Sequence, residues 1–556
     1  MTSTQQDVPC REARGETEFD AIVVGAGFAG LYMLHKLREL GMKATAIERA
    51  DGVGGTWHWN RYPGCRCDIE SLAYSYSFSE ELQREWTWTH RYAAQPEILS
   101  YLNHVADRFD LRKDIQLSTS VTAAHYDDAS ATWAVQTDSG ERLRSRFFVM
   151  ATGCLSDRQV PNFAGLESFR GDWYHTGAWP HEGVDFTGKR VAVIGTGSSG
   201  IQSIPLIAKQ AERLYVLQRT PQFAIPAWNG PMDPEVMRHT RENYADYRQK
   251  ILDSFVAVPF ETQDHGAHEA DPQTRQAVFE AAWKDGGYLM LLAYPDLIFD
   301  ERSNAHVSAF VKQKIQARIN DASLAEKLTP SYPFGAKRLC VDTDYFETYN
   351  RDNVTLVSLR ETPLQEIIPG GIRTSGGDLD VDVIVFATGF DAMTGALLAV
   401  DIRGRNGIAL RDAWAAGPKS YLGIAVSGFP NMFTITGPGS PSVLSNMVPA
   451  IEQHVDWLGA LLTYMRDNGF ETVEAEREPE LDWAARVDEI ASATLYPRAD
   501  SWYMGRNVPG KVEGFMPFAG GTIMYREIVE DIAARGYSGF ALDSRTPART
   551  VEHATV

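Results

Sequence analysis

The chain carries the same strand–glycine loop–helix pattern twice, and this repeat restricts its fold more than any other feature. The first copy begins with the apolar run 21–24 and continues through Gly25, Gly27 and Gly30 into a segment with leucines at helical spacing. In a βαβ unit such glycines allow a tight turn, close approach to a pyrophosphate and packing of helix on strand. We therefore predict an α/β fold with Rossmann-like domains.

The first copy ends in an acid that suits a nucleotide ribose. Glu48 closes the second strand, 18 residues after Gly30. A carboxylate there accepts hydrogen bonds from ribose hydroxyls, while the free N–H groups at the helix start attract phosphate. The alternative is a chance glycine loop, and the flanking strand, helix and acid weigh against it.

The second copy differs at the position of this acid. Gly195, Gly197 and Gly200 follow the apolar run 191–194, but the next strand ends in Gln218 and Arg219. Removing the acid and supplying an arginine favours a ribose 2′-phosphate, as in NADP. A solvated surface arginine is the alternative explanation of Arg219.

Two further apolar strands close on Ala-Thr-Gly, at Gly153 and Gly389, and they mark the points where the chain crosses between domains. The second dinucleotide unit is therefore expected to be inserted in the first. We predict a first dinucleotide-binding domain from 1–152 and 390–556, a second from 153–220 and 335–389, and a helical insert at 221–334.

Composition excludes several kinds of protein. A formal net charge of −20 argues against nucleic-acid binding, which needs clustered cations. No apolar run approaches the roughly 20 residues that cross a bilayer. Five scattered cysteines fit a reducing compartment, so we expect a cytoplasmic protein. Neither the pair Cys65 and Cys67 nor the loop histidines His265 and His268 have further ligands nearby, so no metal site is predicted.

Two motifs resemble those of type I Baeyer–Villiger monooxygenases. The segment FRGDWYHTGAWP matches the family fingerprint FxGxxxHxxxWP at Phe169, Gly171, His175, Trp179 and Pro180. The segment GGTWHWNRYPGCRCD matches a second family pattern at Gly54, Gly55, Trp57, Tyr62, Pro63, Gly64 and Asp68. The resemblance covers nearly the whole chain and is closest to the phenylacetone and steroid monooxygenase branch.

The resemblance implies a reaction. Such enzymes reduce bound FAD with NADPH, form a C4a-peroxyflavin with O₂ and insert one oxygen atom next to a ketone carbonyl, giving an ester or lactone. Arg338 matches the cation that stabilises the peroxide and the adduct, and Asp68 matches the carboxylate that orients it. A helix N-cap is the structural alternative for Asp68.

The resemblance also implies contacts with cofactors and substrate. Lys337, with Arg219 and Thr220, corresponds to the 2′-phosphate site, and Trp502 contacts the nicotinamide nucleotide, with Gln95 and Pro96 on the same side. The other expected cofactor residues are Gly25, Gly27, Ala29, Gly30, Glu48, Thr56, Trp57, Asp68, Tyr74, Val121, Met447, Gly195, Thr196, Gly197, Ser198, Ser199, Gly200 and Gln202. The expected substrate pocket includes Ser440, Ser442, Val443 and Leu444.

His175 invites assignment as a general base. Its position between the first Ala-Thr-Gly strand and the second dinucleotide unit, with aromatic neighbours, favours a packed connector instead. We predict that it ties the interdomain linker through hydrogen bonds to backbone and does not attack substrate, so that the fingerprint marks a hinge for NADP(H).

Three alternative functions stay open at this point. An N- or S-oxygenating flavin monooxygenase shares much of the pattern, although Trp179-Pro180 favours the Baeyer–Villiger class. A disulfide reductase needs a CxxxxC pair, which the sequence lacks. In a non-catalytic flavin-binding protein, Arg338 and an NADP site would have little purpose. The sequence does not determine which ketone is used, nor whether the chain is a monomer or a small homo-oligomer.

Overall fold

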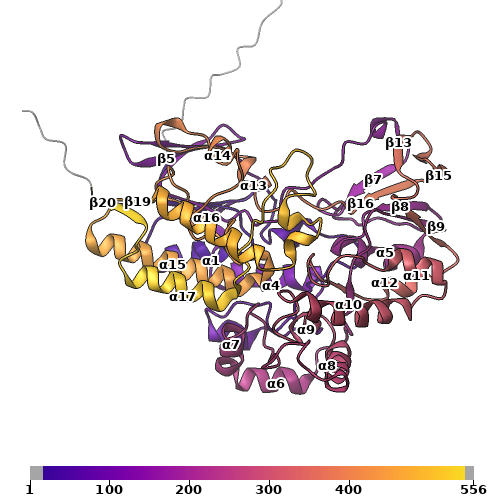
Figure 1. The fold of residues 1–556 in the computed structure, drawn as a ribbon. Coiled ribbons are helices and arrows are strands. Elements are labelled where there is room, and N and C mark those ends of the chain that lie inside the picture. Colours follow the sequence, from indigo (N-terminus) through magenta and orange to yellow (C-terminus); the bar gives the residue numbers. More distant parts are fainter. Residues whose placement is uncertain (1–16, 545–556) are drawn as a thin grey trace, which may run out of the picture.

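The structure, a computed structural model, describes residues 17–544 and is built around two large sheets, of which the first is mixed and the second parallel (Figure 1). Residues 1–16, which include Cys10, and 545–556 lie outside this description. The first sheet has the order β17-β4-β5-β6-β1-β2-β3, with β18 beside β6. Its strands are β1 (Thr17–Val24), β2 (Ala44–Ile47), β3 (Ile115–Gln116), β4 (Val121–Asp127), β5 (Thr132–Thr137), β6 (Arg142–Met150), β17 (Asp401–Arg403) and β18 (Met432–Thr434).

The predicted first unit forms the centre of this sheet. Strands β1 and β2 are parallel, and α1 (Phe28–Glu39) connects them. Leu31, Leu34 and Leu37 are at most 1% exposed, and Gly41, with φ +73°, ends the helix in the left-handed conformation expected of a terminating glycine. Strand β1 begins four residues before the apolar run because its exposed start still pairs with β6.

The second sheet is entirely parallel and has the order β12-β9-β8-β16-β7. Its strands are β7 (Asp172–His175), β8 (Arg190–Ile194), β9 (Arg213–Gln218), β12 (Val354–Ser358) and β16 (Val383–Phe386), and α5 (Ser198–Gln210) joins β8 to β9. A three-stranded antiparallel sheet follows β12: β13 (Leu364–Ile368), β14 (Gly371–Thr374) and β15 (Gly377–Asp380). The α/β fold with two Rossmann-like units is thus confirmed.

The two Ala-Thr-Gly strands explain the first glycine of each nucleotide loop. A Cβ on Gly25 would stand 2.6 Å from the Ala151 carbonyl oxygen, and a Cβ on Gly195 would stand 2.4 Å from that of Ala387. Both glycines also have φ beyond +100°. Each loop therefore accepts only glycine at this position, because the neighbouring strand fills the space.

The insert lies below both sheets in Figure 1 and is mainly helical. Its helices are α6 (Pro234–Glu242), α7 (Tyr244–Leu252), α8 (Pro272–Asp285), α9 (Leu289–Leu292), α10 (Glu301–Gln316) and α11 (Ala322–Leu328). Four of them begin at an aspartate whose carboxylate accepts backbone N–H groups, as N-caps do. The expected helical region starts instead with a strand, β10 (Ala224–Pro226), because its buried residues pair with β11 (Cys340–Asp342).

The remaining elements complete the first domain around α1. Helix α15 (Met447–Asn468) packs on α1, where the Tyr32 hydroxyl donates to Asp456 at 2.6 Å. The others are α2 (Thr56–Trp59), α3 (Glu80–Glu85), α4 (Gln95–Arg108), α13 (Gly395–Leu398), α14 (Leu410–Ala413), α16 (Arg477–Ser492), α17 (Gly521–Ala534), β19 (Thr472–Ala475) and β20 (Phe540–Asp543). Helix α12 (Tyr345–Thr348) packs instead on α5 of the second unit. Among residues 17–544 no helix has both the length and the apolar composition needed to cross a membrane.

Buried His454 gives the fold a dependence on pH. Its Nδ1 accepts the Thr436 N–H at 3.1 Å, its Nε2 lies 2.9 Å from the Tyr525 hydroxyl, and the residue is 1% exposed. Burial lowers its pKa from 6.5 to about 4. Because the unfolded chain takes up this proton near pH 6.5 and the folded chain does not, stability falls as the pH drops from 6.5 to 4.

We expect this one group to contribute about 3 kcal/mol to the loss of stability across that range. Denaturant unfolding at pH 7 and pH 4 measures it. His454→Gln should flatten the pH dependence, although it also lowers stability at pH 7, while His239→Gln on exposed α6 should leave the pH dependence unchanged. An equal dependence of the unfolding free energy on pH in wild type, His454→Gln and His239→Gln would contradict a neutral His454.

Candidate functional site

The first glycine loop forms a cradle closed by the second sequence motif. Gly54 N–H donates to the Ala26 carbonyl at 2.9 Å, and a Cβ on Gly55 would stand 2.9 Å from the Gly27 Cα. A Cβ on Gly30 would collide with the Gly25 carbonyl oxygen at 1.8 Å. The backbone of the two motifs thus meets with no room for side chains, which fits a phosphate-binding turn.

Glu48 lies buried beside this cradle, where β2 ends. Its carboxylate oxygens accept the N–H groups of Ala26 and Ala50, both at 2.8 Å. These bonds fix the carboxylate at the turn, and its further lone pairs can accept ribose hydroxyls. Of the other expected contacts, Trp57 donates from Nε1 to the Tyr74 hydroxyl at 3.2 Å, while Ala29 and Val121 are buried.

The second glycine loop is as tight as the first at its first and third glycines, but there is space around its middle glycine. A Cβ on Gly200 would stand 2.3 Å from the Gly195 carbonyl oxygen, whereas a Cβ on Gly197 would meet nothing within 4 Å. Thr196 donates to the Thr220 carbonyl at 3.1 Å and so holds the loop against the end of β9. The Ser198 hydroxyl lies 3.5 Å from the Cys340 sulfur, and the Ser199 hydroxyl accepts from Thr176 at 3.4 Å.

Gln202 faces the first domain. Its Oε1 accepts the Tyr62 hydroxyl at 2.8 Å, and its Nε2 donates to the Arg66 carbonyl at 3.1 Å. A Cβ on Gly64 would stand 2.4 Å from the Gln202 carbonyl oxygen, so the Tyr-Pro-Gly turn lies directly on α5. The side chain expected to touch a cofactor therefore joins the two dinucleotide units.

Lys337 lies among like charges. Burial, with a smaller effect of the neighbouring Arg219 and Arg360, lowers its pKa to about 8 despite the opposing attraction of Asp500. Several cations that approach one another without an equal number of anions are typical of a phosphate site. The sequence indicated Lys337 and Arg219; Arg360 was missed, because it follows β12 and only the sheet brings it near.

Arg338 and Asp68 form the strongest polar contact of the site. Nη2 of Arg338 donates to both Asp68 oxygens at 2.8 and 2.9 Å, and Nε donates at 3.1 Å. Nη1 donates to the Val443 carbonyl. No helix starts at Asp68, so its carboxylate acts on Arg338 and not as an N-cap.

The charge of Arg338 is held firmly. Burial alone lowers the pKa of Arg338, but Asp68 and the phenols of Tyr288 and Tyr503 outweigh it and raise the pKa well above its usual value. Asp68 and Val443 occupy Nε, Nη2 and one of the two N–H groups on Nη1. The Tyr503 hydroxyl is also within hydrogen-bonding reach of the Arg338 side chain.

Two tyrosines beside Arg338 were missed by the sequence reasoning. The guanidinium lies 4.9 Å from the Tyr288 ring centre, and the buried Tyr288 hydroxyl has no hydrogen-bond partner among the described residues. Tyr503 packs on Trp502, with ring centres 4.4 Å apart. They come from the insert and from a C-terminal 3₁₀ turn (Trp502–Met504), so no spacing in the sequence relates them to Arg338.

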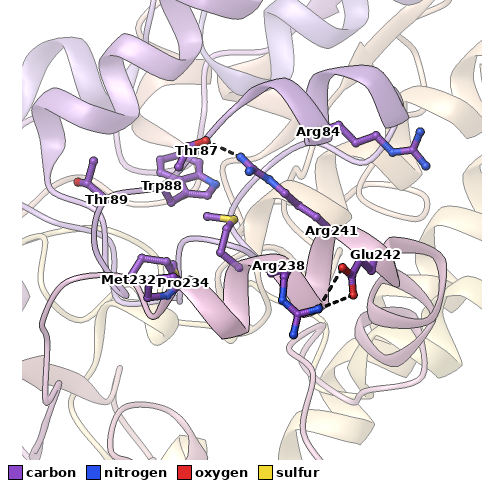
Figure 2. A pocket seen from close by; sticks show the side chains of 10 residues that line it. Arg84, Thr87, Trp88, Thr89, Met232, Pro234, Arg238, Arg241 and Glu242 are labelled. Carbon is purple, nitrogen blue, oxygen red and sulfur yellow. Dashed lines mark hydrogen bonds and ion pairs between the residues drawn. The ribbon is translucent and has the colours of Figure 1, made fainter.

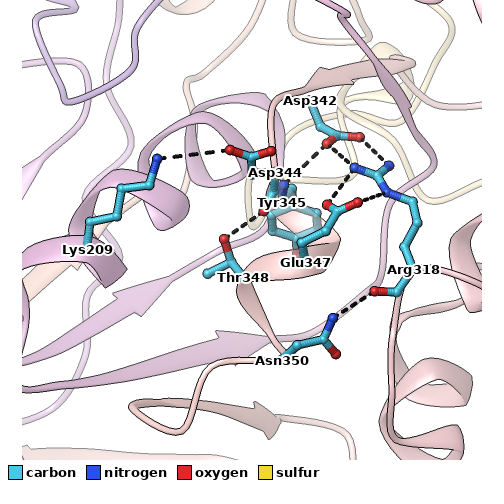
Figure 3. Close-up of polar contacts among 8 residues, drawn as sticks. All are labelled: Lys209, Arg318, Asp342, Asp344, Tyr345, Glu347, Thr348 and Asn350. Atoms are coloured by element: carbon cyan, nitrogen blue, oxygen red, sulfur yellow. Dashed lines mark hydrogen bonds and ion pairs between the residues drawn. The ribbon is translucent and has the colours of Figure 1, made fainter.

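A buried ion-pair network anchors the strand after Arg338 (Figure 3). Arg318, at the end of α10, donates to the Asp342 carboxylate at 2.9 and 3.1 Å and to Glu347 at 2.7 Å. The Asp342 side chain is fully buried, and its Oδ1 also accepts the Tyr345 N–H at 3.2 Å. The insert therefore fixes β11, whose position determines where Arg338 lies.

The fingerprint forms a packed corner of the second sheet. His175 ends β7 at 2% exposure, and its Nδ1 accepts the Gly177 N–H at 2.9 Å. Nε2 lies 3.4 Å from the Thr388 hydroxyl, which donates to the Gln159 carbonyl at 2.7 Å. Burial, followed by the Arg158 charge, lowers the pKa of His175 to about 4, so the imidazole is neutral.

The other fingerprint residues support this corner. Trp179 is 4% exposed and packs between Tyr174 and Phe186, with ring centres 5.6 and 6.2 Å away. A Cβ on Gly171 would stand 2.2 Å from the Asp382 carbonyl oxygen, at the start of β16. The motif thus joins β7 to both crossings between the domains.

The loop 437–447 places a backbone carbonyl beside Arg338. The Ser440 and Ser442 side chains are fully buried, and their hydroxyls donate to the Gly437 and Thr436 carbonyls at 2.8 and 3.2 Å. These bonds hold the loop so that the Val443 carbonyl accepts from Arg338. Leu444 and Met447 are partly buried at the end of the same loop.

The cradles and charges fit two dinucleotides. The first and third glycines of each loop leave no space for a Cβ, an acid lies by the first loop and a group of cations by the second. A separate groove of about 690 Å³ lies between 84–89 and α6 (Figure 2). None of the predicted site residues lines it, so we do not assign it to the reaction.

Comparisons with known proteins place this site in a family. Residues 20–244 match the family described as flavin-binding monooxygenase-like. A Baeyer–Villiger monooxygenase of Pseudooceanicola batsensis is 43% identical over 95% of this chain and 96% of its own. A phenazine N-monooxygenase of Lysobacter antibioticus is 42% identical over 95% and 98%. A solved structure of oxidised steroid monooxygenase bound to NADP has a TM-score of 0.91 and 50% identity, covering 95% of this chain and 100% of that one.

Fold and site together define a flavoprotein monooxygenase with two dinucleotide-binding domains. At these identities and coverages, the chain belongs to the Baeyer–Villiger monooxygenases of the flavin-binding monooxygenase family. It is an FAD- and NADPH-dependent enzyme.

The lowered pKa of Lys337 leads to a prediction about NADP binding. Above pH 8 the free enzyme loses the Lys337 proton, and with it one of the charges that we expect to bind the 2′-phosphate. The dissociation constant for NADP⁺ should therefore rise by up to about tenfold per pH unit between the free and the bound pKa. Titration calorimetry from pH 7 to 10 measures this.

Lys337→Met should weaken binding at pH 7 and remove the dependence on pH above 8. Exposed Lys284→Met is the matched control and should behave as wild type. Adenosine 2′,5′-bisphosphate should show the same pattern and adenosine 5′-phosphate should not. An unchanged pH dependence in Lys337→Met would refute the role of Lys337.

Proposed function

We propose that the chain inserts one oxygen atom of O₂ next to the carbonyl of a ketone, with Arg338 as the cation that stabilises negative charge on the reacting oxygen atoms. The balanced reaction converts ketone, O₂, NADPH and a proton into ester or lactone, NADP⁺ and water. Bound FAD supplies the redox chemistry that activates O₂. The observation that carries the proposal is the contact of Arg338 with Asp68, in which Nε and Nη2 make three hydrogen bonds to the carboxylate, beside the Val443 carbonyl.

Arg338 suits this role because its charge does not depend on pH. A guanidinium stays protonated at every working pH, and Asp68 holds it in one orientation. Its side chain is about 20% exposed, so water screens the charge less than at an open surface. A donor that is already in place stabilises a developing oxyanion without reorganisation during the reaction.

The other predicted residues have supporting roles in this proposal. Glu48 and the first glycine loop bind FAD in the domain of 1–152 and 390–556, and Lys337, Arg219 and Thr220 bind NADP in that of 153–220 and 335–389. Trp502 and Tyr503 close the nicotinamide side. We propose a cytoplasmic enzyme whose partners are the ketone and O₂, acting as a monomer or small homo-oligomer.

N-oxygenation is the second candidate function, because a phenazine N-monooxygenase is a relative of nearly equal identity. That chemistry attacks an electron-rich nitrogen or sulfur, so it does not need a cation that stabilises an anionic adduct. The fixed Arg338 charge favours ketone oxidation. The variant Arg338→Ala distinguishes the two reactions, because only ketone oxidation needs the cation.

Arg338→Ala should lower the rate of ester formation from a ketone by at least about 100-fold, the loss typical of one oxyanion donor. NADPH oxidation should continue and release hydrogen peroxide, whereas oxidation of a sulfide should lose far less. Mass spectrometry of products and a peroxide assay measure these rates. Exposed Arg535→Ala is the control, and equal losses for ketone and sulfide would favour N- or S-oxygenation.

We propose that His175 couples the domains and takes no part in proton transfer. It contacts Thr388, which follows β16, and Gly177 in its own loop, so removing it loosens the corner where the domains join. His175→Ala should retain FAD but consume NADPH with a smaller yield of product. Flavin absorbance and the ratio of product to NADPH test this, and an unchanged ratio would refute the hinge.

A further inference from the structure

Three side chains outside the reaction site converge from two segments that the sequence did not relate. They are Asp51, just after β2, His58, in α2, and His181, directly after the fingerprint residue Pro180. One carboxylate oxygen and one nitrogen from each imidazole all lie within 4.8 Å of one another. More than 120 positions separate His58 from His181, so only the fold brings them together.

One of the three side chains is held in place by burial, and the other two are exposed and can move. His58 is 4% exposed, and its Nε2 lies 3.2 Å from Oδ1 of Asp51. The His58 and His181 rings are 5.3 Å apart at an angle of 68°. Asp51 and His181 are exposed, so their side chains can move without disturbing the core.

We propose that Asp51, His58 and His181 form a binding site for a divalent transition-metal ion such as Zn²⁺. Two imidazoles and a carboxylate suit Zn²⁺, Ni²⁺ or Cu²⁺, whereas Mg²⁺ and Ca²⁺ prefer oxygen ligands only. Bonds of about 2.0–2.2 Å place ligand atoms roughly 3.3–3.6 Å apart, so the exposed ligands need to approach by about 1 Å. Water completes the coordination.

The local structure already orients the ligands. The backbone N–H of His58 donates to the Gly55 carbonyl at 3.0 Å, which ties α2 to the first cradle. On the other side Trp179 is buried, and the Gly183 N–H donates to the Pro180 carbonyl at 3.1 Å, which forms the turn that carries His181. Arg61, whose Nε donates to the His58 carbonyl at 2.7 Å, is a nearby positive charge that Asp51 offsets.

The ion would connect the two dinucleotide units. Asp51 and His58 belong to the segment that continues from the first sheet, and His181 belongs to the loop between β7 and β8 of the second. A metal bond across this contact adds to the one made by Gln202 with Tyr62. This inference concerns metal binding alone and does not rest on the proposed oxygenation.

Titration of the full-length protein, free of any histidine tag, with Zn²⁺ tests the site. We expect one ion per chain, and at least tenfold weaker binding in both Asp51→Asn and His181→Gln. Both positions are exposed, so these variants should fold, and bound flavin absorbance checks this. His239→Gln, an exposed histidine elsewhere, should bind as wild type.

Electron paramagnetic resonance with Cu²⁺ identifies the ligands directly. Wild-type protein should show coupling to two imidazole nitrogens, and His181→Gln should show coupling to one. Zn²⁺ should also raise the midpoint of thermal unfolding in wild type and not in either variant. Absence of a bound ion, or equal binding in wild type, Asp51→Asn and His181→Gln, would overturn the proposal.

Discussion

The contact between the Arg338 guanidinium and the Asp68 carboxylate is the interaction on which the site depends. It joins the segment between the insert and β11 to a turn of the first domain, 270 residues earlier in the chain. Removing one partner of such a half-buried pair leaves the other charge without its counter-ion, which costs stability as well as orientation. The same contact thus holds the domains together and fixes a positive charge at the place where their cofactors are expected to meet.

The rest of the fold serves to place this arginine. Arg318 anchors β11 from the insert, the buried serines of the loop 437–447 present the Val443 carbonyl, and Gly64 allows α5 to lie against the first domain. Of these residues, only Ser440, Ser442 and Val443 are expected to line the substrate pocket. Because each comes from a different segment, the position of Arg338 is a property of the packed protein and of no single motif.

Some features were predictable and others were not. The glycine loops, Glu48 and the loss of an acid at Arg219 follow local rules, because a βαβ unit fixes the turn, the helix start and the strand end within about 30 residues. The resemblance to a family added Arg338, Asp68 and Lys337. The contacts of Gln202 with Tyr62 and Arg66 were not predicted, and Tyr288 was missed, because these contacts join different domains. Arg360 was missed because only the second sheet brings it near Lys337.

The sequence by itself determined the two dinucleotide units, since backbone conformation and helix and strand periodicity are local properties, and its resemblance to a family indicated the class of reaction. Tertiary structure alone decided which side chains meet: the tyrosines beside Arg338, the cations around Lys337 and the trio Asp51, His58 and His181. Such contacts join positions far apart in the chain, and packing of the sheets and the insert, which no local pattern encodes, sets their distances.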